Sequence, residues 1–464
     1  MKQMFTKLFS TVLITASVLT GFTVKAQQTT LASANTLNKK TDSKADTAAT
    51  STIDKQTDAP ATVKPAAKED AAWVPVRRLW GYAFGDLYFN QHADATNRGA
   101  ETMYNGVPAN RNAFQFRRIY LGYDYDINQK FTAEVLLASE PNANTGVIAG
   151  TGTSTSNGDN LADNKMGFFI KNFNLRVRDL WTGTDLVVGE MSTPGFALNE
   201  PGTNGPTSLS EATWGNRFIE KTITDFHKNN SYDVGAALQG TFDPSTKNFG
   251  YVLMVGNNST ASLLTASNPN TGFYKIFYGD LWGKFLDKHL YVDIYSDYAP
   301  TNTSTTTIPD QQNHSMQKIF VAYTTPKFTV GVEAYTQSFK DGVTNTGTKN
   351  VENATAQGIS VWARATLVKD KLFIFGRYDG YNPDTKFDAG NSYTVNTNYG
   401  SYNPTVKETF YTGGLDFTPA PKIHFSPNFW LIDYKDQRSS TTTGYVAPDH
   451  TMVYRMTFYY TFGK

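Results

Sequence analysis

The sequence has 464 residues, with 42 Lys and Arg against 41 Asp and Glu, and it contains no cysteine. This near balance of charge disfavours nucleic-acid binding, and the lack of cysteine excludes disulfides, thiolate metal sites and thiol nucleophiles. Only 18% of the residues are charged, below the roughly 25% of soluble domains, yet a mean hydropathy of -0.42 is too polar for a helical membrane protein.

The segment 1–26 predicts a secretory signal peptide. Lys2 and Lys7 give it a charged start, an apolar core follows, and Ala26 offers a small residue for cleavage. The alternative, a transmembrane anchor, is disfavoured because the apolar run is short and interrupted by Ser and Thr. Segment 27–72 is rich in Thr, Ala, Ser, Lys and Asp, a composition that predicts a disordered periplasmic extension.

From residue 73 to residue 464, apolar and polar residues alternate, which predicts strands with one apolar and one polar face. In segment 115–125, for example, Ile119, Leu121 and Tyr123 oppose Arg118, Tyr120 and Asp124. About sixteen such strands are predicted, and their approximate starts are Arg78, Phe114, Phe131, Lys165, Thr184, Tyr232, Gly250, Gly272, Leu290, Met316, Phe328, Gly358, Leu372, Lys407, Lys422 and Thr451.

Short turns and long polar loops alternate between these strands. The long loops are predicted at 91–112, 141–164, 193–230, 257–271, 300–315, 341–357, 382–406 and 435–450. Short turns at one end and long loops at the other are typical of outer-membrane barrels, and lipid tolerates no open sheet edge. The predicted fold class is therefore all-β, a transmembrane antiparallel β-barrel of about 16 strands in the bacterial outer membrane. A soluble sandwich or propeller is the alternative, but no regular blade repeat is found.

The third long loop, Thr193–Asn230, contains the one helical pattern among these loops. Ser210 is a candidate N-cap, and the apolar residues that follow at helical spacing are Trp214, Phe218, Ile219, Ile223 and Phe226. Arg217 and Lys221 are four residues apart and would share one face. We predict that this third extracellular loop folds inward and narrows the lumen, with Arg217, Glu220 and Lys221 in the constriction. A surface helix with a solvated charge pair is the alternative.

Three stretches resemble outer-membrane porins of the phosphate-selective (O/P-type) superfamily, in particular members from Bacteroidetes-like bacteria. They are Phe116–Gly122, Val187–Pro194, and Trp214–Arg217 with Glu220–Thr222. The resemblance implies a sixteen-stranded, usually trimeric barrel with its third loop folded inward. No match to that family's lysine cluster is found, so phosphate selectivity is not carried over. The aromatic strand Met452–Phe462 also resembles the last strand of outer-membrane barrels, although Gly463 and Lys464 follow it.

Alternation assigns a mixed set of charges to the lumen. The predicted cations are Arg118, Arg176, Arg178, Lys318, Arg364, Arg377 and Arg455, and the predicted anions are Asp86, Asp124, Glu134, Asp293, Asp297, Glu333 and Asp416. The early arginines could favour anions, but a salt bridge to a neighbouring carboxylate is the simpler interpretation of each of them. A mixed lining predicts passage of small polar solutes with weak charge preference.

The predicted function is an outer-membrane porin for passive diffusion of small polar solutes or ions. A non-conducting barrel that serves as a structural subunit of a larger assembly is the alternative. The six histidines show no metal-ligand spacing, and no enzyme motif is found, so neither a metal nor another cofactor nor enzymatic activity is predicted. The expected partners are outer-membrane lipid and lipopolysaccharide, with a homotrimer or other outer-membrane proteins, and no nucleic acid.

Overall fold

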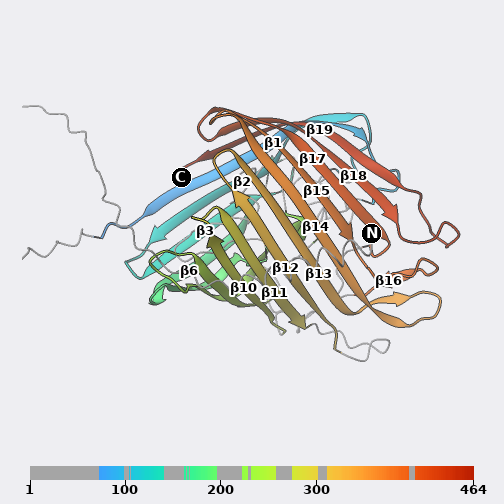
Figure 1. Ribbon diagram of the computed structural model, residues 1–464, viewed down its shortest axis with the longest axis horizontal. Coiled ribbons are helices and arrows are strands. Elements are labelled where there is room, and N and C mark those ends of the chain that lie inside the picture. The colour runs from blue at the N-terminus through green and yellow to red at the C-terminus, as the bar shows by residue number, and fades with distance from the viewer. Residues whose placement is uncertain are drawn as a thin grey trace, which may run out of the picture. The chain divides into compact units, whose positions relative to one another are not determined.

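The computed structural model describes residues 73–98, 104, 106–140, 161–162, 165–166, 168–195, 222–227, 231–257, 274–300, 311–396 and 403–463. The predicted signal peptide and the extension 27–72 lie outside these residues. The described residues belong to one compact unit, Ala71–Lys464. They form a wall of tilted strands that closes on itself, as Figure 1 shows. Among them, no helix is long and apolar enough to cross a lipid bilayer.

Sixteen antiparallel strands make up the barrel. They are β1 (Arg77–His92), β2 (Arg111–Asp126), β3 (Phe131–Ser139), β6 (Phe169–Trp181), β7 (Thr184–Ser192), β8 (Tyr232–Thr241), β9 (Phe249–Gly256), β10 (Ile276–Phe285), β11 (Leu290–Pro300), β12 (Asn313–Thr324), β13 (Phe328–Asn345), β14 (Val351–Val368), β15 (Leu372–Asn382), β17 (Val406–Ala420), β18 (Ile423–Asp436) and β19 (Asp449–Phe462). Two-residue strands β4 (Leu161–Ala162) and β5 (Lys165–Met166) pair with each other. One helical turn, α3 (Ile223–Phe226), lies between β7 and β8.

The barrel closes where its first strand meets its last. β1 pairs with β19 from Gly81 opposite Phe462 to Asn90 opposite Val453, and its other edge pairs with β2. Every strand of the ring therefore has two neighbours, and no backbone edge is left to face lipid. The predicted closed barrel of about sixteen strands is confirmed.

One predicted loop was wrong. Where a long loop was expected at 341–357, β13 continues to Asn345 and β14 begins at Val351, with a hairpin closed by Asn345 N–H donating to the Asn350 carbonyl at 2.9 Å. The three-residue strand β16 (Tyr393–Val395) also pairs with this extension of β13. The polar Thr and Asn residues suggested a loop, but a strand that leaves the membrane needs no apolar face.

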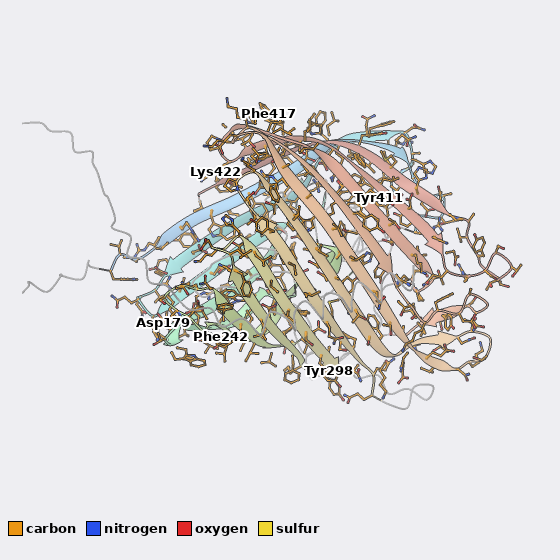
Figure 2. All side chains as sticks on the ribbon, viewed as in Figure 1. Asp179, Phe242, Tyr298, Tyr411, Phe417 and Lys422 are labelled. Carbon is orange, nitrogen blue, oxygen red and sulfur yellow. The ribbon has the colours of Figure 1, made fainter. Side chains whose placement is uncertain are left out.

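The two faces of the wall differ as the alternation predicted. Phe328, Val330 and Val332 are exposed at 43%, 43% and 40%, whereas the intervening Thr329 and the next polar residue Glu333 are buried. Figure 2 shows large side chains such as those labelled Phe242, Tyr298, Tyr411 and Phe417 on the outside of the wall. An apolar outer face on a closed barrel is the structure of a protein that spans the outer membrane.

Exposed aromatic side chains gather near the short turns. They are Trp181, Phe242, Phe249, Phe285, Phe328, Phe417, Phe425 and Phe462. Such a girdle marks the membrane–water interface in outer-membrane barrels, because aromatic rings favour the boundary between hydrocarbon and water. Because outer-membrane barrels have short periplasmic turns and longer extracellular loops, we call the end with the short turns periplasmic and the end with the long loops extracellular.

Large aromatic side chains also project inward, and glycines make room for them. Trp80 lies over Gly122 of the neighbouring strand, where an added Cβ would come within 2.3 Å of the indole ring. Trp362 lies over Gly331 in the same way, again at 2.3 Å. Both indoles are almost fully buried, so these pairs fill the inner side of the wall at the level of the backbone.

Candidate functional site

The first candidate region is the inward face of β19, β1, β2 and β6, which we call the arginine wall. At its centre the buried Asp86 carboxylate binds several donors. Arg117 Nε lies 2.6 Å from it, the Thr457 hydroxyl donates at 2.5 Å, and the Tyr104 hydroxyl donates at 3.1 Å. Arg455 Nη1 lies 4.0 Å away. This one carboxylate of β1 thus holds side chains from β2, from β19 and from the first loop.

A β-bulge places two consecutive arginines inside the barrel. The register pairs Phe84 with Arg118 and Gly85 with Phe116, so Arg117 has no partner in the ladder. Arg117 and Arg118 are both buried, at 0% and 4% exposure. Strict alternation predicted Arg118 but missed Arg117. A signal was present, because the outward apolar positions change from even numbers, with Phe116, to odd numbers, with Ile119.

The other cations of the arginine wall also have carboxylate partners. Arg118 Nη1 donates to the Tyr120 hydroxyl at 2.8 Å and lies 3.4 Å from Glu140, which also pairs with Lys171. The pairs nearer the short turns are Arg176 with Asp185 at 3.0 Å and Arg178 with Asp126 at 2.5 Å. Arg118, Arg176 and Arg178 therefore each lie near a carboxylate.

The remaining predicted residues of the early strands lie on the inward face as well. Asp124 accepts hydrogen bonds from Arg78 Nε at 2.9 Å and from the Trp80 indole at 3.0 Å. Glu134 accepts one from the Asn172 amide. On the far strands, Arg364 lies 3.6 Å over the Phe373 ring. These contacts fix Asp124, Glu134 and Arg364 within the wall.

The second candidate region is the inward face of β10 to β13, which we call the acid wall. The buried charged side chains of these strands are Asp280, Asp293, Asp297, Glu333 and Lys318. The Lys318 ammonium lies 3.7 Å from Asp293 and donates to the Gly195 carbonyl at the start of the third loop. Asp297 accepts a hydrogen bond from the Tyr295 hydroxyl at 2.5 Å. Among the described buried side chains of these four strands, carboxyl groups therefore outnumber cations.

The third loop reaches inward-facing side chains where it is described. Thr193 N–H donates to the Ser231 carbonyl at 3.0 Å, which ties the two ends of the loop together beside β7 and β8. In α3, the Thr224 hydroxyl donates to Glu333 of β13 at 3.0 Å. The Phe226 ring lies 5.9 Å from that of Trp430 of β18.

The next residue, His227, continues these contacts. Its imidazole stacks on Tyr381 of β15 with ring centroids 3.5 Å apart and lies 4.0 Å from Glu408 of β17. These side chains enclose a small cavity with Asp379 and Phe410. Of the predicted helix only the turn α3 is described. Arg217, Glu220 and Lys221 lie outside the described residues, so the inward course of the whole loop stays a prediction.

Comparison with known proteins identifies the fold. No protein-family model and no curated protein matches the sequence. The outer membrane channel DcaP of Acinetobacter baumannii matches with a TM-score of 0.51 at 11% identity, over 84% of this chain and 97% of that chain. This chain has the porin fold.

Two further solved structures match over similar lengths. An anion-selective porin from Comamonas acidovorans has a TM-score of 0.49 at 12% identity, over 84% of this chain and all of that chain (100%). OmpT of Vibrio cholerae has a TM-score of 0.44 at 12% identity, over 85% and 99%. At such identities a likeness speaks of the fold alone, so selectivity has to be argued from the residues of this barrel.

Proposed function

We propose that this chain is a non-enzymatic outer-membrane porin that lets small polar solutes or ions diffuse passively through a water-filled barrel. The observation that carries the proposal is the inward face itself. It presents buried charged and hydrogen-bonding side chains on all sides, as in Asp86, Arg176, Glu333 and Asp416, while the outward face is apolar. A wall with this polarity stabilises water and ions inside and lipid outside.

We further propose that the third loop narrows this channel. Its ends are hydrogen-bonded to each other at β7 and β8, while Thr224, Phe226 and His227 touch side chains of β13, β15, β17 and β18. A chain that leaves one part of the wall and contacts another part has to cross the space between them. In this proposal Arg217, Glu220 and Lys221 face the narrowest part, together with Arg118 and the other early arginines.

The charge of the two walls supports a preference for cations. In the arginine wall Asp86 and Glu140 each lie near two cations, and Arg176 and Arg178 each have a carboxylate partner, whereas among the described buried side chains of the acid wall carboxyl groups outnumber cations. An ion in the channel responds to the summed field of the lining, so a lining with more carboxylates than cations attracts cations. The remaining proposals are cleavage of the signal peptide 1–26, assembly as a homotrimer in lipopolysaccharide-containing membrane, and kinship with O/P-type porins.

Single-channel recording in planar lipid bilayers tests the porin proposal. Purified folded protein should give stable conductance steps, and a barrel that gives none would favour the accessory-subunit alternative. Phe226→Ala should raise the step conductance, because it removes the ring that packs beside Phe410 and Trp430. Phe417→Ala is the matched control, since Phe417 lies on the outer face at 45% exposure. Equal conductance of the two variants would contradict a constriction by the third loop.

A further inference from the structure

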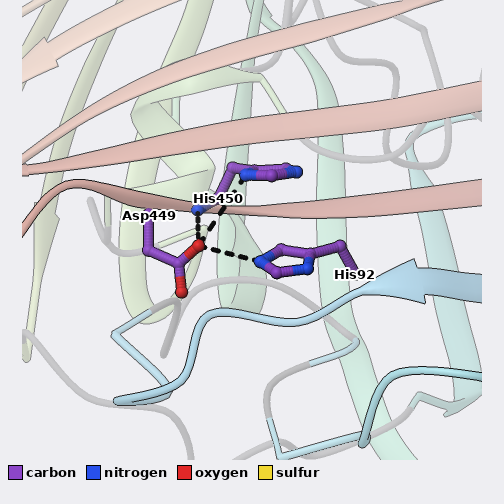
Figure 3. A group of neighbouring side chains, drawn as sticks. All are labelled: His92, Asp449 and His450. Carbon is purple, nitrogen blue, oxygen red and sulfur yellow. Dashed lines mark hydrogen bonds and ion pairs between the residues drawn. The ribbon is translucent and has the colours of Figure 1, made fainter.

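Three side chains with metal-binding atoms meet at the extracellular end of the seam between β1 and β19. His92 is the last residue of β1, and Asp449 and His450 are the first two residues of β19. His92 Nε2 lies 2.8 Å from Asp449 Oδ1, and His450 Nδ1 lies 3.7 Å from the same oxygen. Figure 3 shows the two imidazoles at one side of the carboxylate, and dashed lines join one carboxylate oxygen to both of them.

The spacing of these atoms suits one small metal ion. Zinc binds imidazole nitrogen and carboxylate oxygen at about 2.1 Å, and its tetrahedral geometry sets neighbouring donor atoms about 3.4 Å apart. The distances of 2.8 and 3.7 Å lie on either side of that value, and all donor atoms lie within 4.8 Å of one another. The two imidazoles are partly exposed and would turn out of their parallel stack to place all three donors around one ion.

The backbone already orients the carboxylate. Asp449 Oδ2 accepts a hydrogen bond from Ala95 N–H at 2.9 Å, and Asp449 Oδ1 accepts one from His450 N–H at 2.8 Å. Such outer contacts reduce the entropy that a ligand loses when a metal binds. The two imidazoles lie almost parallel with centroids 4.1 Å apart, and their side chains are exposed at 38% and 42%. An ion from the medium can therefore reach the group, and water can supply a fourth ligand.

We propose that His92, Asp449 and His450 form a binding site for a divalent transition-metal ion with zinc-like ligand preference. The ion would link the first strand of the barrel to the last at the channel mouth. The pairing register shifts there. Asn90 pairs with Val453 and His92 pairs with the adjacent Met452, so β1 has one more residue than β19 at this point. A metal bridge at this place would reinforce the part of the seam where the backbone ladder is interrupted.

Titration calorimetry of the purified full-length protein in detergent, with zinc chloride as the probe, tests the site. One ion should bind per chain, and His92→Gln and His450→Gln should each weaken binding by about tenfold or more. His289→Gln is the matched control, because His289 lies beside a short turn at the other end of the barrel. Binding that is absent from the unaltered protein, or equal in all variants, would overturn the proposal.

The visible absorption of bound cobalt provides a second test of the site that needs no variant. A cobalt ion held by two imidazoles and a carboxylate in a four-coordinate site absorbs visible light strongly, whereas hydrated cobalt is pale. The unaltered protein should show this absorption at one equivalent, and zinc should displace it. Zinc should also raise the thermal unfolding midpoint of the unaltered protein but not that of His92→Gln, because the ion stabilises only the closed seam. If the cobalt added to the unaltered protein kept the spectrum of the hydrated ion at every ratio, the result would contradict the site.

Discussion

The arginine wall and the acid wall line the same barrel but handle charge in opposite ways. In the arginine wall, Arg117 pairs with Asp86 at 2.6 Å and Arg176 pairs with Asp185 at 3.0 Å. In the acid wall, four buried carboxyl groups have one buried ammonium among them, that of Lys318. The electric field in a channel therefore depends less on the number of arginines in its lining than on the carboxylates that lie beside them.

The difference also separates stability from selectivity. A buried ion pair that loses one partner leaves an uncompensated charge, which costs about 3–5 kcal/mol of folding free energy. Carboxyl groups of the lining that outnumber the cations around them contribute instead to the potential that a passing ion meets. Substitutions in the arginine wall should therefore affect folding first, and substitutions in the acid wall should affect the current first.

The largest effect is expected at Asp86. Asp86→Asn removes the charge that compensates Arg117 and, more distantly, Arg455, and it weakens the hydrogen bonds from Thr457 and Tyr104. We expect a loss of about 3 kcal/mol in the free energy of unfolding, measured by urea denaturation in lipid vesicles. Asp287→Asn, on an exposed turn, should stay within about 0.5 kcal/mol of the unaltered protein. Equal stability of both variants would show that the arginine wall is not held by its pairs.

An intermediate effect is expected in the acid wall. The double change Asp280→Asn with Glu333→Gln removes two of its four buried carboxyl groups and leaves Asp293, which lies beside Lys318, in place. The cation-to-anion permeability ratio, obtained from reversal potentials in a salt gradient, should fall by about two- to fivefold, equivalent to about 0.4–1 kcal/mol. The fall should shrink at high salt, because mobile ions screen the fixed charges.

A matched control for that experiment lies in the arginine wall. Arg176→Gln combined with Asp185→Asn removes one positive and one negative charge that lie 3.0 Å apart. The net charge of the lining is unchanged, so the permeability ratio should stay within the error of the unaltered channel. A ratio that moves as far as in the acid-wall variant would mean that pairing does not neutralise the arginines, and the comparison of the walls would fail.

The smallest effect is expected at Asp243, in a periplasmic turn outside both walls. Burial tends to raise its pKa, but hydrogen bonds from Thr246, Phe249 N–H and Asn248 N–H hold the pKa at about 2, below the ordinary 3.8. A lowered pKa means that the ionised form stabilises the fold above pH 3.8 and that this stability is lost as the pH falls through 2.

The stability difference between the unaltered protein and Asp243→Asn should therefore disappear as the pH falls from about 4 to about 2. The side chain is half-buried in a surface turn, so solvent screening keeps the difference below about 1 kcal/mol at neutral pH. The measurement is the unfolding midpoint of both proteins at each pH. Reversal potentials of the two proteins should agree at neutral pH, since the turn lies outside the lining. A difference in selectivity would show that the turn contributes to the field of the channel.

The barrel itself could be predicted from the sequence because its cause is local. A strand between lipid and water needs apolar residues at every second position, and this period is visible in stretches such as Leu290–Asp297. The same reasoning correctly predicted an inward orientation for the side chains of Arg118, Arg176, Asp124 and Glu134. It failed at the tip of β13 and β14, where a strand outside the membrane loses the apolar face that marks it.

The pairing of charges depended on the tertiary structure. Arg117 faces inward only because a bulge in β2 shifts the register beside β1, and Arg176 meets Asp185 only because β6 and β7 pair as they do. The contacts of α3 with β13 to β18 likewise join residues far apart in the chain. His92 and Asp449 are 357 residues apart, so no spacing rule could bring them together. Away from the bulge in β2, the sequence by itself determined which side chains face lipid and which face inward, because that depends on a two-residue period. The register and closure of the sheet decided which inward side chains meet, because only they set the distances between strands.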